Sequence, residues 1–104
     1  MVDDSADIEA EVRFLTTAEG GRRGPVKSGY RGHFFYDGLD WVAVQIYPDS
    51  EWVQLGETVR ALISFMSPDE HVGKLFPGKE FSIREGKLVG KGKVTKLLKL
   101  ADRK

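Results

Sequence analysis

The chain has 104 residues, enough for one small domain with a modest core. It contains no cysteine, which excludes disulfides, thiolate metal sites and cysteine nucleophiles. No apolar run approaches the roughly 20 residues needed to span a bilayer, and the acidic residues 1–7 lack the pattern of a secretion signal. We therefore expect a cytoplasmic protein that does not enter a membrane.

The formal net charge is zero, but the charges are unevenly distributed along the chain. Residues 1–78 contain 7 Lys or Arg against 13 Asp or Glu, a net of −6, whereas residues 79–104 contain 9 against 3, a net of +6. Such a split can create a local positive field on a neutral protein. The alternative is that acidic and basic strands lie side by side and cancel each other.

The first half of the chain contains three stretches typical of β-strands. Residues 8–14 alternate apolar with charged side chains, which predicts a strand with one buried face. Residues 19–29 hold four glycines and a proline and are predicted to form a loop. Residues 34–36 predict a short aromatic strand, followed by an Asp-Gly turn. Residues 41–47 predict a strand that is apolar on both faces and ends at a proline.

The second half of the chain predicts three further strands. The first covers residues 58–66, and residues 69–78 then form a polar connection with two glycines and a proline. Phe81 and Ile83 mark the next strand, which a tight turn at residues 85–87 joins to a last strand running from Leu88 towards Leu98.

Together these elements predict an all-β protein, a six-stranded antiparallel closed β-barrel at residues 8–100. Closing a barrel removes the exposed edges that an open sheet would have to protect. We expect a disordered acidic segment at residues 1–7 and a frayed tail at residues 101–104. Gly90 and Gly92 share one face of the last strand, where the chain must bend sharply or pass close to another backbone.

Two short signatures stand out within this strand-like sequence. The first joins Glu19-Gly20-Gly21-Arg22 to Gly29-Tyr30-Arg31-Gly32-His33-Phe34-Phe35, and the second joins Phe81-Ser82-Ile83-Arg84-Glu85-Gly86 to Val89-Gly90-Lys91-Gly92-Lys93-Val94. In this order and at this separation, they resemble the C-terminal β-barrel of elongation factor Tu, its third domain. The resemblance covers residues 8–98, and it implies a binding module without its GTPase domain.

The resemblance also implies where partners bind. In elongation factor Tu this domain meets the T arm of aminoacyl-tRNA, the GTPase domain and the nucleotide-exchange factor. The RNA-facing positions correspond to Arg31, His33, Glu85 and Gly86, where a backbone N–H and a nearby Arg can grip phosphate and ribose. We add Lys87 and Lys91, two basic residues in or after the turn, to these candidate RNA- or partner-binding residues.

The chain departs from the family pattern at several contact positions. Gly32-His33 replaces Pro-Gln, Arg23 replaces a His, and Lys87 replaces the second glycine of the turn. Ser67 replaces a basic residue, and the connection at residues 69–78 is longer than its counterpart. Because the barrel-building residues remain while these contacts differ, the pattern indicates a changed partner.

Each singled-out group also has a structural interpretation. Five aromatic residues suit base stacking, but aromatics in a small barrel more often form the core; they are Tyr30, Phe34, Phe35, Tyr36 and Trp41. Arg84 and Glu85 are equally consistent with an exposed cross-strand pair. Four lysines share parity and would line one face of a regular strand, which can be a basic stripe or a solvated face; they are Lys87, Lys91, Lys93 and Lys99.

No residue pattern indicates catalysis, a metal or a cofactor. The glycine-lysine run at residues 86–92 lacks the spacing of a phosphate-binding loop, so we expect no GTP binding. His33 and His71, the only histidines, have no ligand spacing, and Asp69-Glu70-His71 reads as a polar loop. A nucleophile elbow and a His-Glu-x-x-His motif are both missing. We therefore expect no enzyme, no cofactor and no metal site.

The predicted function is a non-enzymatic binding module of translation-factor ancestry. Its expected partner is structured RNA such as tRNA, or a translation-associated protein, and we expect neither DNA nor a membrane. The alternative is a protein–protein adaptor or decoy that presents the surface of elongation factor Tu to that factor's protein partners. An exposed apolar patch at Leu75, Phe76 and Leu97 would favour this alternative.

Overall fold

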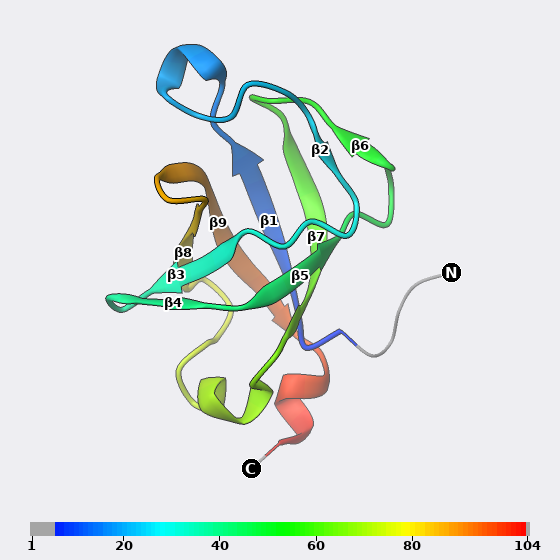
Figure 1. The fold of residues 1–104 in the computed structure, drawn as a ribbon. Coiled ribbons are helices and arrows are strands. Elements are labelled where there is room, and N and C mark those ends of the chain that lie inside the picture. Colours follow the sequence, from blue (N-terminus) through cyan, green and yellow to red (C-terminus); the bar gives the residue numbers. More distant parts are fainter. Residues whose placement is uncertain (1–5, 104) are drawn as a thin grey trace.

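The computed structural model describes residues 6–103 (Figure 1). Within this range the chain forms nine strands, which are β1 Ile8–Phe14, β2 Val26–Lys27, β3 His33–Tyr36, β4 Leu39–Trp41, β5 Ala43–Ile46, β6 Trp52–Val53, β7 Thr58–Phe65, β8 Glu80–Arg84 and β9 Leu88–Leu97. The described residues also form three short 3₁₀ helices, which are η1 Thr17–Glu19, η2 Pro68–His71 and η3 Lys99–Asp102. Over the same residues, none of the helices has the length and apolar character needed to cross a membrane.

Seven of these strands form one antiparallel sheet in the order β4-β3-β8-β9-β1-β7-β5, while β2 and β6 form a separate two-stranded ribbon. The all-β class is confirmed, but the closed six-stranded barrel is wrong, because the sheet is a curled half-barrel with β4 and β5 at its edges. The predicted strand at residues 41–47 breaks at Val42. Its carbonyl accepts the Met66 N–H at 3.1 Å, and the segments on either side of it pair with different strands.

Both ends of the described chain contact the rest of the fold. Residues 1–5 of the predicted acidic segment lie outside the described residues, whereas Ala6 and Asp7 are buried. The Asp7 carboxylate accepts the Phe65 N–H at 2.8 Å, so the packed region begins before β1. At the other end, η3 runs past residue 100, and the Arg103 guanidinium lies 2.6 Å from the Asp69 carboxylate.

Aromatic side chains fill much of the concave side of the sheet. Phe34 and Tyr36 are buried, so for these two residues the core interpretation is correct. The Phe34 ring stacks on Phe81 with centroids 4.1 Å apart and meets Phe65 edge-on at 4.9 Å. Full burial of one such ring contributes roughly 1.5–3 kcal/mol of hydrophobic stabilisation.

The two glycines of β9 allow this aromatic packing. Gly92 lies opposite Val12 of β1 and Phe81 of β8, so its Cα is at the centre of the curl. A methyl group at Gly92 would overlap the Phe81 ring and lie 2.8 Å from the Glu11 carbonyl oxygen. The predicted close approach to another backbone is therefore confirmed.

We expect Gly92→Ala to lower the free energy of unfolding by about 1–3 kcal/mol, because the added methyl group forces Phe81 or the Glu11 backbone to move. Urea denaturation measures this loss. The matched control is Gly24→Ala, since a methyl group there has nothing within 4 Å. The control should change stability by less than about 0.5 kcal/mol. Equal losses in the two variants would contradict the packing argument.

Candidate functional site

The structure brings the two sequence signatures together at one hollow. The loop that follows η1 and the turn between β8 and β9 face each other across an open cleft of about 290 Å³. Its lining residues are Gly21, Arg22, Arg23, Gly24, Glu85, Lys87 and Val89. Residues more than sixty positions apart in the chain therefore form a single surface.

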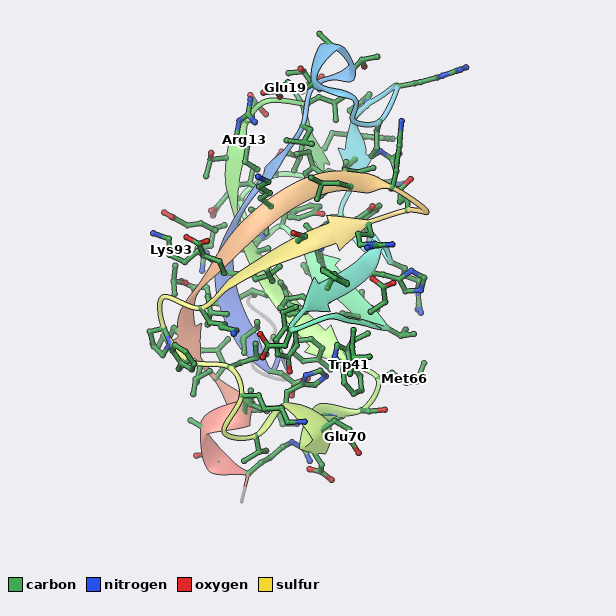
Figure 2. All side chains as sticks on the ribbon, turned by 90° about the vertical axis from the view of Figure 1, so that its left-hand side faces the viewer. Arg13, Glu19, Trp41, Met66, Glu70 and Lys93 are labelled. Atoms are coloured by element: carbon green, nitrogen blue, oxygen red, sulfur yellow. The ribbon has the colours of Figure 1, made fainter. Side chains whose placement is uncertain are left out.

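Local backbone features set the two sides of this hollow. On one side, Thr16 and Glu19 form a capping box around η1, and the Arg13 guanidinium holds the Glu19 carboxylate at 3.1 Å (Figure 2). On the other side, the Glu85 N–H donates to the Lys87 carbonyl at 2.9 Å, and Gly86 has a φ of +74°. This left-handed conformation explains the glycine at the tip of the turn.

Glu85 links the two sides through its side chain. Its Oε2 atom accepts hydrogen bonds from the Arg22 guanidinium and from the Tyr30 hydroxyl. The Arg22 guanidinium also lies over the Tyr30 ring, 5.4 Å from its centroid. The Glu85 carboxylate is thus already paired with Arg22 and Tyr30, and a binding partner would meet it in this paired state.

Titration of this cluster follows from burial and pairing. Burial raises the pKa of Tyr30, and the hydrogen bond and charge of Glu85 raise it further. Burial acts to lower the pKa of Arg22, but the hydrogen bond and charge of Glu85 outweigh it, and the pKa is raised. Tyr30 therefore stays a neutral donor and Arg22 a cation across the physiological pH range.

Arg84 does not pair with Glu85, so the cross-strand alternative is wrong. The Arg84 guanidinium lies 3.5 Å from the Asp40 carboxylate and 4.7 Å from the centroid of the Phe35 ring. Sequence reasoning named Glu85 but missed its contacts with Arg22 and Tyr30. Both belong to the first signature, yet only the fold shows that this signature meets the turn.

Among the other predicted site residues, Lys87 lines the hollow. Arg31, His33 and Gly86 are exposed. Arg31 lies between Tyr30, which bonds to Glu85, and His33, whose Cα is opposite Arg84 in the β3–β8 pair. Within residues 6–103, neither Arg31 nor Lys87 has an ion-pair partner, and the same holds for Arg23.

Lys91 faces a different groove on the convex side of the sheet. This open groove of about 460 Å³ also contains Arg13, Lys93, Glu11 and Glu80. The predicted four-lysine stripe is wrong, because Lys87 lies in the turn before a register shift and Lys99 lies in η3. The Cα atoms opposite Lys93 belong to Glu11 and Glu80, so acidic and basic strands are interleaved on this face.

Neither hollow is an enclosed cavity, and the part of the chain that the structure describes holds no group of three or more His, Asp or Glu side chains suited to a metal ion. The fold and this surface define a small all-β domain that offers an open, cation-rimmed cleft.

Comparison with known protein families agrees with this class. The family model of the elongation factor Tu C-terminal domain matches residues 1–98. The chain therefore belongs to the elongation factor Tu C-terminal domain family, and the resemblance noted in the sequence is confirmed. Membership in this family indicates a translation-related binding module.

We expect Tyr30→Phe to destabilise the domain by about 1 kcal/mol, because it removes a hydrogen bond to a carboxylate that is only partly screened by solvent. Glu85→Gln should have a similar effect, and the double variant should lose less than the sum of the two. Urea denaturation of all three variants gives the coupling energy.

The control is Glu51→Gln, the same chemical change at a carboxylate that has only an exposed lysine 3.8 Å away. It should leave stability within about 0.5 kcal/mol of the wild type. Strictly additive losses for Tyr30 and Glu85 would show that their hydrogen bond does not hold the two signatures together.

Proposed function

We propose that this chain is a non-enzymatic, cytoplasmic module that binds structured RNA such as tRNA at the hollow between residues 20–25 and 85–87. The observation that carries the proposal is the balance of charge there. The single carboxylate, Glu85, is neutralised by Arg22, while Arg23, Lys87 and the neighbouring Arg31 have no ion-pair partner among the described residues. The rim therefore keeps a positive charge that suits phosphate groups.

The type of contact indicates recognition of the backbone rather than of base sequence. Arg and Lys side chains that contact phosphates fix position and supply salt-dependent affinity. Two of the aromatic residues that could stack on bases, Phe34 and Tyr36, are buried. Phe35 lies beside Arg84, and the Tyr30 hydroxyl is bonded to Glu85. We therefore expect binding to depend on RNA shape and charge.

The test is a fluorescence-anisotropy titration of tRNA at about 50 mM and 200 mM salt. At the lower salt the wild type should bind with a Kd below roughly 100 μM, tighter than weak non-specific binding. The variant Arg23→Ala/Lys87→Ala should bind about tenfold more weakly. Its salt slope should fall by about 1.4–1.8, since two phosphate contacts are lost. A DNA duplex of equal length should bind more weakly than tRNA.

The matched control, Lys74→Ala/Lys99→Ala, removes the same charge in the segment after η2 and in η3. Figure 1 shows η2 and η3 at the end of the molecule opposite η1. If both double variants lose the same affinity, the effect is one of net charge and the hollow is not the site. No binding below roughly 100 μM at low salt would refute the RNA proposal.

The second candidate is the protein–protein adaptor, which an exposed apolar group favours. Leu39, Val42 and Met66 are 59%, 43% and 70% exposed, and the backbones of Val42 and Met66 are hydrogen-bonded. The predicted patch at Leu75, Phe76 and Leu97 is wrong, because Leu75 is buried. A lysate pull-down should then capture a protein that is lost with Met66→Glu. Recovery of RNA alone would count against the adaptor.

A further inference from the structure

The segment between β7 and β8 is attached to the sheet mainly by side chains. We define residues 67–77 as the flap. Its main-chain hydrogen bonds stay within the flap or reach only to its border at Lys79, as in the bond from the Leu75 N–H to the His71 carbonyl. Main-chain bonds to the sheet occur just outside it, from Met66 to Val42 at 3.1 Å and from Gly78 to Val94 at 2.7 Å. The flap can therefore move without breaking a strand pair.

Two buried side chains, Leu75 and His71, hold the flap closed, assisted by the solvent-facing ion pair of Asp69 with Arg103. His71 is completely buried, so the polar-loop interpretation is wrong at this residue. Its ring centroid lies 4.0 Å from that of Phe65 and 4.6 Å from that of Trp41.

The surroundings of His71 suit only a neutral ring. Nδ1 forms a hydrogen bond with the Tyr36 hydroxyl at 2.7 Å, while Nε2 has no partner among the described residues. A protonated ring would need an acceptor at both nitrogens, and it would place a charge among aromatic side chains. The Phe65 and Trp41 rings can attract a cation, but this attraction is smaller than the cost of burying an unpaired ion.

The charged groups near His71 do not reverse this preference. Burial lowers the pKa of His71, and the ammonium of Lys74 in the flap lowers it further. Asp7, before β1, and Glu70, in the flap, act in the opposite direction, but the net pKa lies below the usual 6.5. The Asp7 carboxylate already accepts the Phe65 N–H. Tyr36 of β3 offers a hydroxyl rather than a charge.

We propose that the flap is a pH-sensitive lid, which opens when acid protonates His71 and thereby uncovers the aromatic end of the core beneath it. Figure 2 shows Trp41, Met66 and Glu70 on the same side of the molecule. Opening would join Tyr36, Trp41 and Phe65 to the exposed Met66, and so enlarge an apolar surface.

The direction of the pH effect follows from linkage. The open state binds a proton at His71 with an ordinary pKa near 6.5, and the closed state binds it more weakly. Closure is therefore fully favoured above about pH 6.5 and weakens as the pH falls through the lowered pKa of the closed state. Between about pH 6.5 and the lowered pKa of the closed state, each unit by which the pH falls should raise the ratio of open to closed flap by up to about tenfold.

The first test is an NMR titration of the wild-type chain from pH 8 to pH 4. We expect the His71 ring to titrate below the ordinary histidine pKa of about 6.5. Amide exchange of residues 67–77 should accelerate over the same range, while β1 and β9 remain protected. Titration of His71 at or above about pH 6.5 would overturn the proposal. A lowered pKa of His71 without faster amide exchange in the flap would also overturn the proposal, because it would show that His71 has only a structural role.

The second test follows Trp41 fluorescence in a Trp52→Phe background, because Trp52 in β6 is the only other tryptophan. Binding of an apolar dye should rise as Trp41 becomes exposed in acid. His71→Phe keeps an aromatic ring in place and should abolish the transition, whereas His33→Ala should leave it unchanged. Persistence of the transition in folded His71→Phe would refute the lid. If that variant does not fold, the wild-type titration decides.

Discussion

The fold depends on how closely β9 can approach its neighbours. Gly90 and Gly92 leave room on the concave face for the Phe14 and Phe81 side chains, and they bring the Glu11 and Arg13 backbones into contact with β9. With larger residues, the central strands would separate and the sheet would flatten. The curl allows Phe34, Phe65 and Phe81 to meet across it. The same curl brings the turn after β8 over the loop that follows η1.

Sequence reasoning recovered the elements whose signal is local. The alternation at residues 8–14 and 58–66, the Asp-Gly turn and the turn at residues 85–87 all correspond to observed features. Sequence reasoning failed where the result depends on distant partners. The break at Val42 arises because Met66 binds its carbonyl, and nothing within residues 41–47 signals this. The ribbon of β2 and β6 has two residues per strand, too few for any periodicity.

At the candidate site, too, sequence reasoning fails where a result depends on residues distant in the chain. The hollow contains residues from both signatures. The contacts that these residues make with one another could not be predicted from the sequence. The carboxylate of Glu85, one of the predicted binding residues, accepts hydrogen bonds from Arg22 and Tyr30. The sequence around His71 predicts a polar loop, because nothing in a polar segment indicates that one of its side chains is buried. Burial of His71 in the short helix η2 depends on contacts with Tyr36, Trp41 and Phe65, which are distant in the sequence.

Asp7 joins the two ends of the described chain. Its carbonyl accepts the N–H groups of Leu98 and Leu100, at 2.9 Å and 3.2 Å, while its carboxylate accepts the Phe65 N–H. Entry and exit of the chain are therefore adjacent on one side of the sheet. Domains with this arrangement tolerate circular permutation and insertion into a surface loop of a host protein. The half-barrel could thus be inserted into another polypeptide, and the two host segments on either side of it would remain close together.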